Sequence, residues 1–142
     1  MEKSLTKQQI INNYSPLLLA FMGDSVIELF VREHLLVDGN TTGCKATENS
    51  REYVTAEKQS EAVERILSLL TDDELSVYKR GRNSKSLHTP KHASPTDYRR
   101  ATGFESLFGY LYLNKEIDRA KFLFQKAYDI DNGDTTWGNY HI

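Results

Sequence analysis

Apolar residues recur three and four positions apart along most of this chain, and no segment alternates clearly between apolar and polar residues. A repeat of three to four residues is that of an α-helix, whereas a strand repeats every two. The pattern predicts helices over residues 16–36, 45–70, 71–80, 96–114 and 117–128, the second as one bent helix or two abutting ones. A chain of 142 residues can bury one core unaided, and this one has no internal repeat or linker between two cores. We therefore predict an all-α fold with a single domain.

Polar residues mark where several of these helices begin. Ser15 can cap a helix that has Pro16 in its first turn. Thr71 stands three residues before Glu74, which is the spacing of a capping box, and Thr96 can cap the helix that runs to residue 114. Residues 81–95, GRNSKSLHTPKHASP, contain two prolines and hardly an apolar side chain, so we predict an exposed loop there.

The ends of the chain carry little core-forming sequence. Residues 131–142, DNGDTTWGNYHI, are rich in turn formers, and we expect a flexible tail unless Trp137 docks, with the folded domain covering residues 1–130. The N-terminal residues hold no apolar run long enough for a signal peptide or a membrane span. The single cysteine, Cys44, cannot form an internal disulfide, and no base accompanies it, so we expect a spare thiol. These features predict a cytoplasmic protein.

Asp24, in the segment AFMGDSVIE, occupies a position where the helical pattern calls for an apolar side chain. The stripe that contains it runs through Leu17, Ala20 or Phe21, Ile27 and Val31. Removing an unpaired carboxylate from water costs several kcal/mol or more. A partner that compensates for the charge is therefore expected beside Asp24.

Glu105 repeats this anomaly in the helix predicted for residues 96–114. Small residues lie within a turn of both carboxylates, which would let the two helices approach closely: Ala20, Gly23, Ala101, Thr102 and Gly109. Two carboxylates brought together repel and raise each other's pKa unless a cation lies between them, and hard oxygen ligands suit Mg²⁺. The alternative is a pair of polar residues that are satisfied separately.

The positive charge of the chain is concentrated in one segment. Residues 79–100 contain seven basic residues against one acid, Asp97, whereas the rest of the chain carries 11 basic and 19 acidic residues. A basic patch on an otherwise acidic protein is typical of a surface that binds a polyanion. A solvated charge run is the alternative. The four histidines lie outside the carboxylate motifs, and we interpret them as surface or loop residues, with His88 and His92 near enough to the basic segment to contact phosphate.

Three segments in order, LAFMGDSVIELFVREHLL, RGRNSKS and YRRATGFESLFGYLYL, resemble the ribonuclease III catalytic domain, and in particular its small bacterial form, Mini-ribonuclease III. The resemblance spans residues 14–128. It implies an all-helical, homodimeric endonuclease that requires Mg²⁺ and cuts double-stranded RNA to leave 5′-phosphate and 3′-hydroxyl ends. It also implies no separate double-stranded-RNA-binding domain and, as substrate, the precursor of large-subunit (23S) ribosomal RNA.

The resemblance assigns the catalytic and metal-binding roles to Asp24, in the GDS signature, and to Glu105. Accessory acidic positions of the larger relatives fall on Leu17, Ala20 and Thr102 in this chain, so it keeps only the two central carboxylates. Because the accessory carboxylates are lost, the sequence leaves open whether the chain holds a second metal ion independently. RNA phosphate could supply the missing oxygens.

Substrate and subunit contacts follow from the same resemblance. The residues expected to bind RNA are Lys79, Arg80, Arg82, Asn83, Lys85, Lys91, Arg99 and Arg100. Because such contacts reach phosphates rather than base edges, little sequence preference is expected. Phe21 matches a family position whose aromatic ring enters a socket of the partner subunit, while a central core helix in a monomer remains the alternative. A non-catalytic binder of double-stranded RNA and a structural component of a ribonucleoprotein remain alternative functions.

Overall fold

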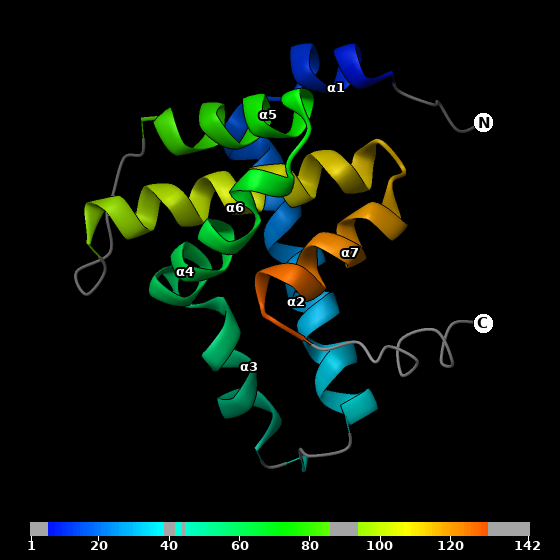
Figure 1. The fold of residues 1–142 in the computed structure, drawn as a ribbon, viewed down its shortest axis with the longest axis vertical. Helices are drawn as coiled ribbons and strands as arrows, with labels where there is room; N and C mark the ends of the chain where they lie inside the picture. Colours follow the sequence, from blue (N-terminus) through cyan, green and yellow to red (C-terminus); the bar gives the residue numbers. More distant parts are fainter. Residues whose placement is uncertain (1–5, 39–41, 44, 86–93, 131–142) are drawn as a thin grey trace.

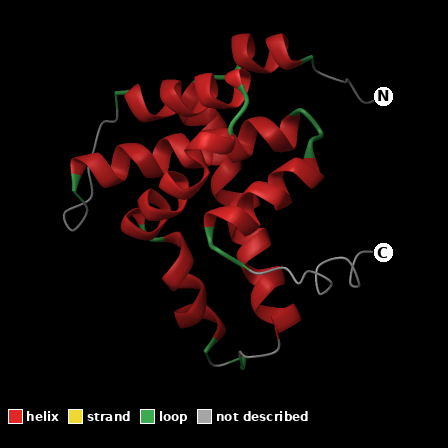
Figure 2. Cartoon of the chain, viewed as in Figure 1, coloured by secondary structure: helices red, strands yellow, loops and turns green. Residues whose placement is uncertain are grey.

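The computed structural model describes residues 6–38, 42–43, 45–85 and 94–130, and all regular structure in these ranges is helical (Figure 2). The helices are α1 (Lys7–Asn13), α2 (Pro16–Asp38), α3 (Ala46–Val54), α4 (Ala56–Ile66), the 3-10 turn η1 (Leu67–Leu69), α5 (Asp72–Asn83), α6 (Pro95–Leu113) and α7 (Ile117–Ala127). The predicted all-α fold is confirmed. The predicted tail, Lys91, Cys44, His88, His92 and His141 lie outside the described residues.

Two long helices, α2 and α6, cross at the centre of the molecule, and the other helices pack around them (Figure 1). In this view α5 lies along one side of α6, and α4 and α7 lie along the other. The core between them is rich in aromatic rings that meet edge to face, such as Phe104 with Phe108 at 4.8 Å and Phe30 with Phe124 at 5.6 Å between ring centroids. This packing holds α2, α6 and α7 in fixed positions relative to one another.

The crossing of α2 over α6 depends on two glycines. A Cβ atom added at Gly23 would lie 1.7 Å from the backbone oxygen of Glu105, and one added at Gly109 would lie 1.9 Å from that of Leu19. Any side chain at either position would push the two backbones apart. The predicted close approach of the helices is therefore confirmed.

Most of the predicted helix starts are confirmed, and one is wrong. The Ser15 hydroxyl accepts a hydrogen bond from the Leu18 amide at 3.2 Å, and Thr71 and Glu74 form both bonds of a capping box. The cap of α6 is Ser94 rather than Thr96, because Pro95 fits the first helical position and the Asp97 amide donates to the Ser94 hydroxyl at 3.0 Å.

Helix boundaries differ from the prediction near the start of the chain and at the end of α5. The short helix α1 was not predicted, although Thr6 and Gln9 form a capping box at its start. Of the two alternatives for residues 45–70, two abutting helices are confirmed, because Thr55 adopts an extended conformation and caps α4 with its side chain. Helix α5 continues to Asn83 and buries Gly81 against α6, so residues 81–83 belong to a helix and not to the predicted loop.

The apolar stripe around Asp24 lies only partly on the side of α2 that faces the core, because Ala20, Ile27 and Val31 are buried whereas Leu17 and Phe21 are not. The core-facing residues are Leu19, Val26, Ile27, Phe30 and Val31, whereas Leu17, Leu18 and Phe21 are 42%, 55% and 78% exposed. Asp24 is exposed as well, so the expectation that it is buried within one chain is wrong. The sequence pattern could not separate the core-facing side of this helix from an apolar outer side.

The apolar character of α2 also bears on membranes. Among the described residues, no single helix is both long and apolar enough to span a membrane. Helix α1 and residues Pro16–Val37 together are long and apolar enough, but the chain bends by 114° between them. Core helices of soluble proteins have the same length and composition.

Candidate functional site

Asp24 of α2 and Glu105 of α6 are brought together at the helix crossing. Burial, the charge of Asp24 and a hydrogen bond between the two carboxyl groups raise the pKa of Glu105 to about 8, and the Gln59 side chain acts in the opposite direction. Two carboxyl groups this strongly coupled are not satisfied separately. The first of the two interpretations of their sequence positions, a shared site, is the one that the geometry supports.

The backbone around the pair explains why these side chains meet. Gly23 is the residue before Asp24, and its lack of a side chain allows the backbone of α2 to contact the carbonyl of Glu105. Ser106, the residue after Glu105, is buried and its hydroxyl bonds to the Pro16 carbonyl at 2.8 Å, which ties the start of α2 to α6. Both carboxylates therefore project from a rigid part of the fold.

The site offers the two carboxylates of Asp24 and Glu105, while Glu28, one turn after Asp24 on α2, is paired with Arg32. In the described part of the chain, no group of three or more His, Cys, Asp or Glu side chains is arranged to hold a metal ion. Leu17 and Ala20 are apolar, and the Thr102 hydroxyl, which donates to the Tyr98 carbonyl at 2.9 Å, carries no negative charge. A divalent cation held here would complete its shell with water, phosphate oxygens or groups from another molecule.

Gln59 of α4 is part of this site and was missed from the sequence. Its side chain is 2% exposed and lies close enough to Glu105 to lower the pKa of that carboxyl group. Its amide nitrogen, Nε2, is buried and finds no partner of good hydrogen-bond geometry among the described residues. The signal was present: Gln59 stands three, four and seven positions before Ala62, Val63 and Ile66, in the buried stripe of α4.

A shallow depression continues from the carboxylate pair along the outer face of α2. Asp24, Ser25, Glu28, Leu29 and Arg32 line it. Glu28 and Arg32 form an ion pair at 3.6 Å between Oε1 and Nη2. The depression places Asp24 at an edge that solvent can reach, beside the exposed apolar residues of the same helix.

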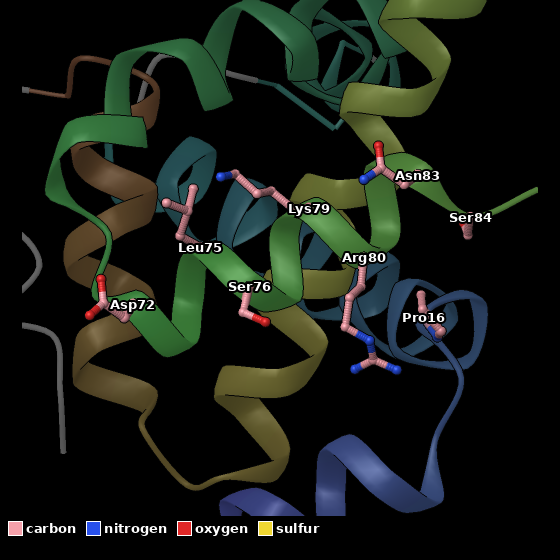
Figure 3. Close-up of a pocket in the computed structure, with 8 residues that line it drawn as sticks. All are labelled: Pro16, Asp72, Leu75, Ser76, Lys79, Arg80, Asn83 and Ser84. Carbon is pink, nitrogen blue, oxygen red and sulfur yellow. The ribbon is translucent and has the colours of Figure 1, made fainter.

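The predicted RNA-binding residues divide between two sides of α5. Lys79, Arg80 and Asn83 line an open pocket on the outer side of the helix, where the Arg80 side chain lies beside Pro16 at the start of α2 (Figure 3). Within the described residues, the buried Nη1 of Arg80 has no hydrogen-bond partner. The pocket also contains the acidic Asp72, so its charge is not uniformly positive.

The other basic side chains lie toward α4 or in solvent. The Arg82 guanidinium lies over the Tyr78 ring at 5.7 Å from its centroid, and Arg100 pairs with Glu64 of α4 at 3.1 Å. Lys85 and Arg99 are exposed. The sequence did not predict that Glu64 would form an ion pair with Arg100, one of the residues expected to bind RNA.

The family model described as "Ribonuclease III domain" matches residues 17–116. The chain is 40% identical over 126 residues to Mini-ribonuclease 3 of Thermoanaerobacter sp., covering 89% of this chain and 88% of the relative. It is 37% identical over 134 residues to Mini-ribonuclease 3 of Brevibacillus brevis, covering 94% and 98%. A crystal structure of a Fusobacterium nucleatum protein aligns with a TM-score of 0.74 at 28% identity, covering 82% of this chain and 93% of that one.

Proposed function

Because the chain belongs to the ribonuclease III family and is therefore an endonuclease that hydrolyses RNA, we propose that it cuts double-stranded RNA with Mg²⁺ held by Asp24 and Glu105. The products would carry 5′-phosphate and 3′-hydroxyl ends. The substrate in the cell would be the precursor of large-subunit (23S) ribosomal RNA, in the cytoplasm.

The observation that carries this proposal is the coupling of the two carboxyl groups. Burial and the Asp24 charge raise the pKa of Glu105 to about 8, which means that the metal-free site resists carrying both negative charges. A divalent cation between the carboxylates would relieve this repulsion, and Mg²⁺ is commonly held by one or two carboxylates together with substrate phosphate. The donor set therefore fits this ion.

The residues of the chain have distinct tasks in the proposed reaction. Asp24 and Glu105 would hold the cation from two rigid helices, which would fix where the scissile phosphate and the attacking water bind. When bound, Mg²⁺ lowers the pKa of a coordinated water and neutralises charge that develops on the phosphate. No histidine is needed as a base, and His34, the one histidine in the described residues, packs edge to face against the Tyr53 ring, with 5.9 Å between the ring centroids.

The basic residues of α5 and α6 would bind the backbone of the duplex. Arg80 has an unpartnered buried nitrogen within the described structure, and Lys85 and Arg99 extend into solvent. Such groups can reach phosphates, which fix the position of the duplex without reading its sequence. The division of the basic residues between two sides of α5 suggests contact with more than one part of the backbone.

The exposed apolar face of α2 supports a homodimer. Leu17, Leu18 and Phe21 form a patch at the N-terminal half of this helix, beside the exposed Asp24. A second copy seated on the patch would remove it from water. Two catalytic pairs would then lie on one assembly, and each could cut one strand of a duplex.

A direct test is incubation of the purified chain with a long RNA duplex, the single strand of the same sequence and the DNA duplex of the same sequence. The proposal predicts cleavage of the RNA duplex alone, only with Mg²⁺ present, with 5′-phosphate ends on the products. Cleavage of the single strand at the same rate, or of the duplex in excess chelator, would contradict it. A chain that binds duplex but never cuts it would point to the non-catalytic binder.

A further inference from the structure

Gln59 is a buried polar residue at the site for which the proposed chemistry has no task. It lies in the second turn of α4, whose neighbouring turns are anchored by the fully buried Ala62, Val63 and Ile66. A leucine or methionine at this position would continue the apolar stripe and would leave no amide in the core. The sequence instead keeps a side chain whose nitrogen is buried without a partner of good geometry among the described residues.

The surroundings of this nitrogen limit what could satisfy it. Buried N–H groups in proteins nearly always have a hydrogen-bond partner, so one without a partner in the metal-free chain calls for an explanation. The Gln59 side chain interacts with the Glu105 carboxyl group and favours the ionised form of that group. An amide N–H is a donor, and an ionised carboxylate accepts more strongly than a carboxylic acid.

We propose that Gln59 is a positioning residue, whose amide nitrogen donates a hydrogen bond to the Glu105 carboxylate when that carboxylate holds a divalent cation. The inference rests on the proposed function. The bond would fix one oxygen of Glu105 and leave the other directed at the cation and at Asp24. Residues that orient a metal-binding side chain in this way raise metal affinity without touching the ion.

The position of Gln59 suits this role because little order is lost when the bond forms. Helix α4 is capped by Thr55, whose hydroxyl accepts from the Lys58 amide at 3.3 Å, and it is packed against α6 along its buried face. The donor is therefore already held beside the carboxylate before a cation arrives. A structural filler would need the volume of Gln59 but not its nitrogen.

The test is the affinity of the full-length chain for Mn²⁺, titrated without RNA and followed through the electron paramagnetic resonance of the free ion. Gln59→Leu and Gln59→Met keep most of the volume and remove the donor. Ser60→Ala, a buried polar change at the next residue of α4, is the matched control. Asp24→Asn defines the binding that remains without the primary site.

We expect both Gln59 variants to bind Mn²⁺ about 10- to 100-fold more weakly than the wild type, as is usual when a partner of a metal ligand is removed. Ser60→Ala should keep the wild-type affinity. Both Gln59 variants should unfold at a temperature no lower than the metal-free wild type, because an unpaired buried amide has been removed.

Wild-type Mn²⁺ affinity in Gln59→Leu and Gln59→Met would overturn the inference and leave the proposed function standing. A wild type whose Mn²⁺ binding equals that of Asp24→Asn would overturn both, because no cation would then be held by the carboxylate pair. Should Gln59→Leu fail to fold, Gln59→Met decides the question alone, since its unbranched side chain follows the same path as glutamine.

Discussion

Gly23 of α2 lies directly against the backbone carbonyl of Glu105 on α6, so that a Cβ atom at position 23 would stand 1.7 Å from that oxygen. This contact sets the distance between the two helices, and hence the distance between Glu105 and Asp24, the residue after Gly23. The geometry of the carboxylate pair is thus encoded in a glycine that has no chemistry of its own.

The first prediction concerns this contact. Gly23→Ala places a methyl group on a backbone atom that cannot rotate away, so α2 and α6 must separate, and we expect a loss of stability of roughly 1–3 kcal/mol or more. Urea unfolding measures it. Gly43→Ala is the control, because nothing lies within 4 Å of a Cβ atom added there. Equal stabilities of the two variants would show that the helix crossing is not as tight as described.

The second prediction concerns pH and the metal-free protein. The pKa of Glu105 is raised from 4.5 to about 8, so between these values the folded chain holds a proton that the unfolded chain releases. The free energy of unfolding therefore falls by a few kcal/mol as pH rises through this range, since one pKa unit corresponds to about 1.4 kcal/mol. Above the range it stays constant.

Glu105→Gln isolates this effect, because it removes the ionisable group and keeps the size of the side chain. The variant should match the wild type below the range and be more stable above it, as measured by urea unfolding in chelator. Saturating Mg²⁺ should reduce the difference in stability between Glu105→Gln and the wild type at high pH, because the ion stabilises the charged pair in the wild type. A difference in stability that does not change with pH would contradict the coupling of Asp24 and Glu105.

The third prediction concerns Phe21, which is 78% exposed in the single chain. Replacing it with alanine removes no core contact, so the fold of the monomer should be unaffected. If a partner subunit covers the ring, the dimer loses roughly 3–5 kcal/mol and dissociates at low protein concentration. Sedimentation measures this, and cleavage should recover at high concentration.

Phe122→Ala is the matched control for Phe21, because this ring is 40% exposed on a different helix, α7. It should leave the sedimentation of the protein unchanged. A wild type that sediments as a monomer at all concentrations would rule out the dimer.

The fourth prediction separates the basic residues from the chemistry. Changing Arg82, Lys85 or Lys91 to alanine should weaken duplex binding by a similar factor for all sequences and leave single-turnover cleavage at saturating RNA nearly unchanged. Each lost phosphate contact should reduce the slope of log affinity against log salt by roughly 0.7–0.9. Filter binding at several salt concentrations measures the slope.

Lys126→Ala controls for a general loss of positive charge, because Lys126 lies on α7 over the Phe122 ring and not in the basic segment. Its salt slope should equal that of the wild type. A triple variant of Arg82, Lys85 and Lys91 that binds duplex with wild-type affinity would instead identify the segment as a solvated connection between helices.

The sequence carried enough information for the fold because helical periodicity and caps are local signals. Ser15 and Thr71 cap helices where they were expected. Ser94 was misjudged because two residues of the cap-forming type flank Pro95, and the preference of proline for the first helical position would have decided between them. Helix α1 has a capping box in its sequence, but it buries only Ile10 and therefore shows no apolar repeat from which a helix could be predicted.

The site was predictable in its two carboxylates but not in its surroundings. Asp24 and Glu105 stand out as charges in apolar stripes, and the same reasoning applied to residues 56–66 would have found Gln59. The exposure of Asp24 could not be predicted, because an apolar outer face of a helix has the same sequence pattern as a face that packs in the core. The pairing of Arg100 with Glu64 joins residues far apart in sequence and needs the fold.

The central claim is that Asp24 and Glu105 act together to hold the cation that cleaves the duplex. Its most direct test is single-turnover cleavage of an RNA duplex of about 30 base pairs, roughly twice the span of a compact duplex-binding domain, by the wild type, Asp24→Asn and Glu105→Gln at saturating Mg²⁺. We predict that each variant folds, binds the duplex and cleaves it roughly a thousandfold more slowly or not at all, because the bound metal contributes several kcal/mol to the transition state. Near-wild-type cleavage by either variant would contradict the claim.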